Sequence, residues 1–343
     1  MNPGGKLTLY EIAKLAGVSK SSVSRVLMNQ RGISDETRQR ILDIMKKSGY
    51  RPSQFARGLA GGRTGLIAVM TPGIFSGYYA DVLRGIDVVA HARGVHLITS
   101  FSHGADDYRS LLVEFTRPGR VDGLILVAPA MDTFRMPAPA EGTPVVLVSA
   151  RPPRRSAGWE RLDSVTVNNE QAIERVMTYL QEQGCRRVVH LAGPSGVFDA
   201  RERRRAFEGF CKANRAMKGH VVHGEETRQE AVSALMKFLD HGGKKQDGVV
   251  AYNDDMAIGV VRALREKRIR VPEDMCVTGC DDEQPAELLG LTTLHMPMVE
   301  LGEEAARLLF GRIDGEAAGL LARQNVLDMG LVARSTTSKR RKA

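Results

Sequence analysis

Residues 20–25 place polar and basic side chains on one face of a short predicted helix. That face consists of Lys20, Ser21, Ser24 and Arg25. An arginine can donate paired hydrogen bonds to guanine, and serine hydroxyls together with backbone N–H groups can hold phosphates. On most helices such a face only contacts solvent. The pattern indicates nucleic-acid binding only if the surrounding elements present this helix to a groove.

The surrounding segment predicts two helices joined by a tight turn. Thr8 is a candidate N-cap with a glutamate three residues later, Gly17 lies in the turn, and Ser19 can cap the second helix. Ser34 begins a third helix that ends near Lys47. Apolar residues recur on one side of all three helices. This order is typical of a helix-turn-helix unit, whose second helix lies in the DNA major groove.

Charge is distributed unevenly along the chain. The formal net charge is +9, and the first 65 residues hold 12 Lys/Arg against 4 Asp/Glu. Residues 339–342 are all basic, so the long middle part is slightly acidic. A basic N-terminal unit beside a nearly neutral body indicates a polyanionic partner at one end. We interpret the basic tail as a disordered, solubilising end.

The four cysteines follow no metal-binding spacing. Cys185, Cys211, Cys276 and Cys280 each lie in or beside an apolar segment, as small buried hydrophobes do. No charged-then-apolar leader and no run of eighteen apolar residues occurs. We therefore expect a cytoplasmic protein with no membrane span, no metal ion and no other cofactor.

From residue 66 onward, short apolar runs alternate with helical patterns. Strands are expected at 66–71, 95–100, 121–128, 144–149, 164–167, 187–192, 247–252 and 275–279, and helices near 79–93, 170–183, 200–213, 227–241 and 254–267. Continuous apolar strands between helices predict parallel sheets covered on both faces. The fold class is therefore α/β, with two Rossmann-like subdomains behind a small all-α headpiece.

The segments AGVSKSSVSRVL, SDETRQRI and GYRPSQFARGLAGGRTGLIAV resemble the LacI/GalR family of transcriptional repressors. The resemblance extends over essentially the whole chain and is most specific in the first 65 residues. It implies that Lys20, Ser21 and Arg25 occupy base-contacting positions. It also implies phosphate contacts from Ser19, Ser24 and Asn29. Thr8 is a further candidate DNA-contacting residue.

Residues 53–60, SQFARGLA, match the hinge helix of that family. The resemblance implies that two hinges pair in the minor groove and that Leu59 inserts between bases, although Leu59 could instead pack on its own domain. The hinge residues expected at the DNA are Ser53, Ala56, Arg57 and Leu59. The family more often has Asn at position 53 and Ser where Gly58 stands. Glycine in a helix costs about 1 kcal/mol relative to alanine, so we expect this hinge to form only on DNA.

The resemblance also divides the chain. It implies a headpiece (1–52), a hinge helix and linker (53–65), a body for effector binding and dimerisation (66–335) and a basic tail (336–343). The body is shaped like a periplasmic sugar-binding protein, with three crossovers between its lobes. Lobe 1 is expected at about 66–162 plus 294–325, and lobe 2 at about 163–293 plus 326–335.

Ligands of such sheets bind outside the carboxyl ends of the strands. The resemblance places Arg203, Asn253 and Asp281 at the effector, where a guanidinium suits paired hydrogen bonds to hydroxyls or carboxylates. Asp254 and Asp282 are expected to be structural instead. In lobe 1 the candidates are Thr71, Phe75, Tyr79 and Ser149. Many sugar-binding members carry Asp near position 149, which this chain lacks, and the aromatic residues could stack on a sugar or belong to the core.

These observations predict a ligand-responsive, sequence-specific DNA-binding regulator, most simply a repressor of carbohydrate-related genes. It would bind a palindromic operator as a homodimer, with a sugar, sugar acid or sugar phosphate in the cleft between the lobes. The alternative is a solute-binding receptor on the same two-lobed fold, which the N-terminal unit disfavours. The sequence has no nucleophile motif, phosphate loop or metal spacing that would indicate an enzyme. The family's tetramers use a C-terminal leucine-heptad helix, and no heptads follow Arg334, so a dimer is expected.

Overall fold

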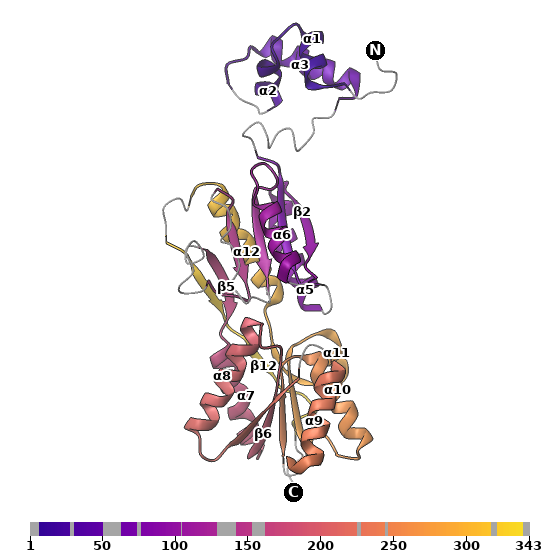
Figure 1. Cartoon of the computed structure of the whole chain (residues 1–343), viewed down its shortest axis with the longest axis vertical. Coiled ribbons are helices and arrows are strands. Elements are labelled where there is room, and N and C mark those ends of the chain that lie inside the picture. Colours follow the sequence, from indigo (N-terminus) through magenta and orange to yellow (C-terminus); the bar gives the residue numbers. More distant parts are fainter. Residues whose placement is uncertain are drawn as a thin grey trace.

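The computed structural model describes most of the chain. The described residues are 7–27, 31–50, 63–73, 77–103, 105–128, 142–152, 162–224, 228–243, 246–316 and 321–338. Several expected site residues lie outside these ranges, namely Asn29, Ser53, Ala56, Arg57, Leu59 and Phe75. Figure 1 shows the helices α1 to α3 at one end of the chain and two sheet-containing lobes beyond them.

Three helices form the N-terminal unit: α1 (Leu9–Ala16), α2 (Lys20–Leu27) and α3 (Asp35–Ser48). The Thr8 side chain accepts from the Glu11 amide while the Glu11 carboxylate accepts from the Thr8 amide, which confirms the capping box. Gly17 ends α1 in the left-handed conformation, with φ of 65°. One small core holds the three helices together, and it is built from Ile12, Ala13, Ala16, Val23, Val26, Ile41 and Met45.

Lobe 1 is built on a six-stranded parallel sheet. Its strands are β1 (Leu66–Thr71), β2 (His96–Phe101), β3 (Gly123–Val127), β4 (Val145–Val148), β5 (Asp163–Val167) and β11 (Gln324–Leu327). The strand order is β11-β5-β4-β3-β1-β2. Helices α5 (Gly77–Ala92) and α12 (Met298–Ile313) pack on one face, and α6 (Ala105–Phe115) packs on the other.

Lobe 2 repeats this plan. Its strands are β6 (Arg187–Ala192), β7 (Lys218–His223), β8 (Gly248–Ala251), β9 (Cys276–Asp281), β10 (Thr292–His295) and β12 (Gly330–Val332). The order is β12-β10-β9-β8-β6-β7, and only β12 is antiparallel to its neighbour. One face carries α9 (Arg228–Phe238) and α10 (Asp254–Glu266), and the other carries α7 (Asn169–Glu182) and α8 (Phe198–Ala213). A π-helical turn (Leu239–Gly243) and the short α11 (Gln284–Leu288) complete it.

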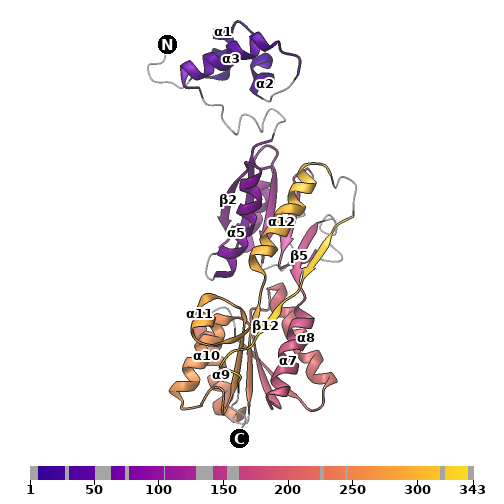
Figure 2. The ribbon, with the colours of Figure 1, turned by 180° about the vertical axis from the view of Figure 1, so that it is seen from behind.

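The chain passes between the lobes three times. It crosses from β5 to α7, from β10 to α12, and from β11 to β12. Figure 2 shows the yellow C-terminal segment making the last of these passages. Each lobe is therefore assembled from segments that are distant in the sequence.

The expected boundary between the lobes at residue 162 is wrong by one strand. Residues 164–167 were expected in lobe 2, but β5 pairs with β4 and β11 in the sheet of lobe 1. Asp163 anchors it there, because its carboxylate forms a two-bond ion pair with Arg312 of α12 at 2.8 Å. The pattern of a fully buried strand predicts the strand but not the sheet that it joins. The boundary at residue 162 rested on the family resemblance, whereas β5 continues the sheet of lobe 1.

Candidate functional site

The exposed face of α2 carries the expected DNA-contacting side chains. Lys20, Ser21 and Arg25 are exposed, whereas Ser24 is half-buried. Val23 and Val26 turn to the core and fix which side of the helix faces outward. The structure therefore brings three of the four side chains to one accessible surface.

Ser19 acts as the cap of α2. Its hydroxyl accepts from the Ser22 amide at 3.1 Å and lies 2.8 Å from the hydroxyl of Ser21. The start of α2 thus presents hydroxyls and helix N–H groups together, an arrangement suited to a phosphate oxygen. Thr8 is exposed and is engaged in its own capping box.

Arg203 lies at the centre of a buried polar group at the junction between the lobes. It is 3% exposed, and its Nε donates to Asn169 Oδ1 at 2.9 Å. Its Nη1 donates to the carbonyl oxygen of Tyr252 at 2.7 Å, and its Nη2 lies 4.0 Å from Met296 Sδ. The Asn169 amide donates in turn to Asp199 Oδ1 at 2.8 Å. Asn169, Tyr252 and Met296 come from three separate segments of the chain, and together they fix the orientation of the Arg203 guanidinium.

Asp281 ends β9 close to this group. It is 8% exposed, and within the described part of the chain no side chain or amide donates a hydrogen bond to its carboxylate. Burial, and next the charge of Asp254, raise the pKa of Asp281 well above its ordinary value, while Arg203 opposes that shift. A buried carboxyl group without a protein donor is available to hydroxyl groups of a ligand.

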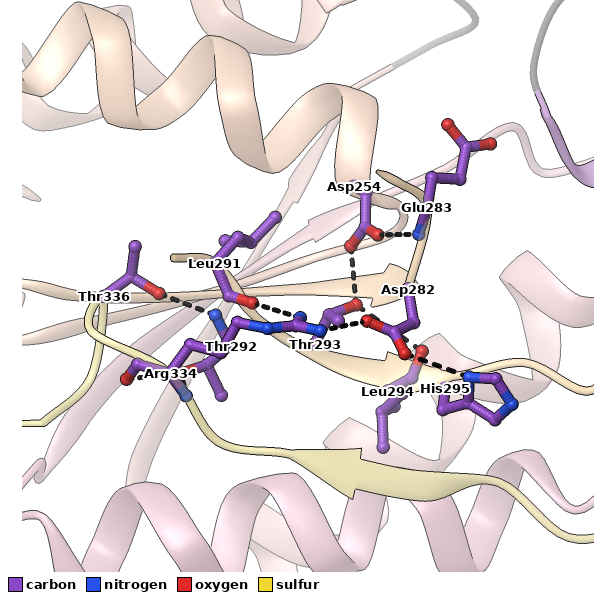
Figure 3. A network of polar contacts seen from close by, with 10 residues as sticks. All are labelled: Asp254, Asp282, Glu283, Leu291, Thr292, Thr293, Leu294, His295, Arg334 and Thr336. Carbon is purple, nitrogen blue, oxygen red and sulfur yellow. Dashed lines mark hydrogen bonds and ion pairs between the residues drawn. The ribbon is translucent and has the colours of Figure 1, made fainter. Parts of the chain in front are cut away.

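Asn253 and Asp254 follow β8 and have different surroundings. The Asn253 side chain caps α10 by accepting from the Met256 amide at 2.9 Å, and it remains half-buried. Asp254 is buried and accepts from the Thr293 hydroxyl at 2.6 Å and from the Glu283 amide at 3.0 Å (Figure 3). Burial is the main cause that raises the pKa of Asp254 to about 6. Asn253, the expected ligand, thus also caps a helix, and Asp254 has the structural role expected for it.

Asp282 is likewise engaged within lobe 2. Its two oxygens pair with Arg334 at 2.7 Å and with His295 at 3.0 Å. The next side chain, Glu283, points away from this network in Figure 3. Its Oε1 accepts from the Tyr78 amide at the start of α5, at 3.2 Å, and so bridges the two lobes.

The lobe 1 side of the junction is less polar. Ser149 is 1% exposed and accepts from the Tyr78 hydroxyl at 2.7 Å. Tyr79 is half-buried and packs edge-on against Tyr78, with ring centroids 5.0 Å apart. Thr71 is fully buried, and its hydroxyl exchanges two hydrogen bonds with the backbone of Gly73. The structure therefore groups Tyr78, Tyr79 and Ser149, whereas Thr71 is engaged in its own turn.

Sequence reasoning missed several residues at the junction between the lobes. Asp199 precedes Arg203 by one helical turn on α8, so the four-residue spacing was a usable signal. Asn169 begins α7 directly after β5. The sequence assigned β5 to lobe 2, although it belongs to the sheet of lobe 1. Glu283 carries no local signal, because its partner amide belongs to α5, about two hundred residues earlier.

Two negative findings apply to the described residues. No group of three or more His, Cys, Asp or Glu in the described ranges is arranged to hold a metal ion. None of the helices described is both long and apolar enough to span a bilayer. The arrangement instead offers one fixed guanidinium, one free carboxyl group and neighbouring tyrosines, which suit the binding of a small polar molecule.

Comparisons with known proteins identify both parts of the chain. Residues 8–53 match the model of bacterial regulatory proteins of the lacI family, and residues 177–337 match a periplasmic binding protein-like domain. The transcriptional regulator PtxS of Pseudomonas putida is 27% identical over 97% of this chain and 96% of its own length. The ribose operon repressor of Escherichia coli is 29% identical over 89% of this chain and 93% of its own length.

Solved structures agree with these matches. The complex of the regulator CelR with cellobiose superposes with a TM-score of 0.72 at 28% identity, covering 96% of this chain and 99% of that one. A lac repressor dimer bound to operator and the anti-inducer ONPF gives a TM-score of 0.80 at 25% identity, covering 97% and 99%.

The fold and the site define a helix-turn-helix protein with a two-lobed, ligand-binding body. The chain is similar to LacI-family bacterial regulators along nearly its whole length, and its residues 8–53 match that family's model. It is a transcriptional regulator rather than an enzyme, and its fold is that of the periplasmic-binding-protein-like members.

Proposed function

We propose that this protein represses carbohydrate-related genes by binding a palindromic operator as a homodimer, and that a sugar-like effector at the interlobe junction controls its DNA affinity. One observation carries the proposal: a DNA-contacting face on α2 and a free carboxyl group beside a fixed guanidinium occur in the same chain. A dimer is supported by the operator-bound lac repressor dimer, and a sugar by the cellobiose complex of CelR. Because operator DNA is its partner, we also propose a cytoplasmic location.

At the DNA, we assign base contacts to Lys20, Ser21 and Arg25, and backbone contacts to Ser19 and Ser24. The exposure of α2 supports this assignment. Ser53, Ala56, Arg57 and Leu59 remain proposed minor-groove residues on the resemblance alone, as does Asn29 for a phosphate contact.

Selection of duplexes from a random library by the full chain tests the DNA-binding part. We expect enrichment of a palindrome with two half-sites, and Arg25→Ala should weaken binding and relax preference at one base pair by about 1–3 kcal/mol. Arg40→Ala, which removes an exposed arginine from α3, is the matched control and should leave base preference unchanged. A loss with Arg25→Ala that is uniform across sequences, with a salt slope lower by about 1, would assign Arg25 to a phosphate instead.

At the junction, we propose a hydroxyl-bearing effector and assign contacts with it to Arg203 and Asp281. Asn253 lies at the same edge of the sheet and is assigned to the same ligand. Tyr79 and Ser149 are proposed from lobe 1, and Thr71 and Phe75 on the resemblance alone. A thermal-shift screen of neutral sugars, sugar acids and sugar phosphates tests this. Asp281→Asn should abolish the shift caused by the best compound, whereas Asp282→Asn should lower stability but keep that shift. Equal loss in both variants would contradict the assignment.

A further inference from the structure

Arg63, which directly follows the stretch 51–62, contacts the C-terminal end of α12. Its Nη1 donates to Asp314 Oδ1 at 2.7 Å, and its Nη2 donates to the carbonyl oxygen of Ile313 at 2.9 Å. Arg93, just beyond α5, donates to the other oxygen of Asp314 at 2.7 Å, and its guanidinium lies 4.8 Å from the ring centre of Phe310. One carboxylate thus joins three segments. We call Arg63, Arg93 and Asp314 the Asp314 clamp.

The Asp314 clamp is better suited to fixing position than to adding stability. The side chains of Arg63, Arg93 and Asp314 are 61%, 45% and 22% exposed. Hydrogen bonds from Arg93 and Arg63 lower the pKa of Asp314. Ion pairs with this much solvent contact contribute little to stability. Two guanidiniums on one carboxylate, with a further bond to the helix-end carbonyl, instead fix the direction in which the chain enters β1.

The other ends of α5 and α12 lie at the interlobe junction. The N-terminal end of α5 meets lobe 2, where the Tyr78 amide donates to Glu283. Helix α12 starts two residues after Met296, whose sulfur contacts Arg203. With 16 residues, α12 extends over roughly 24 Å. Both helices therefore run from the proposed effector site to the Asp314 clamp.

The two helices are packed backbone to backbone between these ends. A Cβ atom added at Gly85 of α5 would collide with the carbonyl oxygen of Val299, and one added at Gly302 of α12 would collide with the carbonyl oxygen of Val82. Figure 2 shows α5 and α12 side by side in lobe 1. Contact this close resists sliding of one helix along the other, so they move together.

We propose that Arg63, Arg93 and Asp314 are positioning residues that connect the α5–α12 pair to the chain leading to the DNA-binding unit. A shift of lobe 2 against Glu283 and Met296 moves the helix pair, and the Asp314 clamp passes that movement to Arg63. This inference rests on the proposed function, because it explains how the state of the junction alters DNA affinity.

Hydrogen exchange on the full chain, with and without the best duplex from the selection above, tests the connection. Coupling between sites is reciprocal and typically amounts to about 5- to 150-fold in affinity, so DNA binding must also alter the junction. In the wild type, DNA should slow amide exchange about fivefold or more in segments 77–80 and 296–300. In Arg63→Gln and Asp314→Asn this change should disappear, with the melting temperature within about 2 °C of wild type.

Arg307→Gln is the matched control. Arg307 is 55% exposed on the same helix and pairs only with glutamates of α12 in the described structure, so its loss should leave the DNA-dependent protection intact. Arg93→Gln provides a third clamp variant if another fails to fold. Clamp variants that keep the protection, or a wild type without it, would overturn the inference. Failure to enrich any duplex would instead contradict the proposed function.

Discussion

The two lobes share one strand order, but among the described residues only those of lobe 2 bury charged groups where the lobes meet. Its junction edge holds Asp199, Arg203, Asp254 and Asp281, each less than a tenth exposed. In the described part of lobe 1, the buried polar side chains at the facing edge are uncharged, as in Tyr78 and Ser149. Lobe 1 instead buries the Asp163 carboxylate at the start of β5, where it pairs with the half-buried Arg312.

Equivalent positions make this difference specific. Ser149 follows the fourth strand of lobe 1 and Asp281 ends the fourth strand of lobe 2, and both have positive φ, 50° and 131°. At the ends of these two strands, lobe 1 presents a hydroxyl engaged by a tyrosine, and lobe 2 presents a carboxyl group without a protein donor. Under the proposed function, lobe 2 is therefore expected to make the charged contacts with the ligand.

The largest expected effect tests the dependence of lobe 1 on close helix packing. Gly302→Ala should lower the free energy of unfolding by about 3 kcal/mol, because the new Cβ meets backbone that cannot yield. Gly259→Ala in lobe 2 should cost less, since its neighbours are side-chain atoms of Arg228 and Val232 rather than backbone. Urea unfolding measures all variants.

Gly311→Ala is the control for helix propensity. Gly311 lies in α12 with nothing near its added Cβ, so the substitution should stabilise by about 0.5–1 kcal/mol. Equal losses of unfolding free energy from Gly302→Ala and Gly259→Ala would show that the two lobes depend equally on close helix packing.

The next effect concerns pH and lobe 2. His190 is fully buried in β6, and burial is the main cause that lowers its pKa to about 4. The unfolded chain takes up the proton near pH 6.5, before the folded chain does. Stability from this residue is therefore complete above about pH 6.5 and falls as the pH drops towards 4, by up to about 3 kcal/mol.

The measurement is the difference in unfolding free energy between wild type and His190→Leu across this range. Asp254, whose pKa is raised to about 6, makes the folded state more stable as the pH falls. This contribution is present in both proteins, so it cancels in the difference. His91→Gln, at an exposed position of α5, should leave the profile unchanged. An identical profile for wild type and His190→Leu would contradict the prediction.

The smallest effect compares the two sides of the junction directly. Asn169→Ala removes hydrogen bonds to both Arg203 and Asp199, and should cost about 2 kcal/mol because both partners are charged. Tyr78→Phe removes one neutral hydrogen bond to Ser149 and should cost about 1 kcal/mol. Calorimetry that finds Tyr78→Phe the costlier change would reverse the proposed division between the lobes.

The helix-turn-helix unit could be predicted from sequence almost completely. Thr8, Gly17, Ser19 and Ser34 are local signals whose partners lie three or four residues away, and the structure confirms each. Eight strands of the body were also predicted within about two residues, because continuous apolar runs mark them. Several other elements were not predicted from the sequence, including α6, β7 and β10.

The connections across the molecule could not be predicted in the same way. The pairing of β5 with β11 joins residues about 160 apart, and the Glu283 contact with α5 spans a still longer separation. A single sequence indicates that a strand is buried but not which neighbour covers it. Asp199 shows an intermediate case, since its helical spacing to Arg203 was visible while the bridging Asn169 was not.

The order of the crossovers has a consequence for a chain that is still being synthesised. Proteins leave the ribosome from the N-terminus, and the three-helix unit has its own core within the first fifty residues. The sheet of lobe 1, by contrast, is finished only when β11 arrives at residues 324–327, after nearly all of lobe 2. Every growing chain therefore displays a completed DNA-binding unit on an unfinished body. A truncated chain that stops before β11 keeps the three-helix unit. It lacks the edge strand of lobe 1 and the last crossover between the lobes.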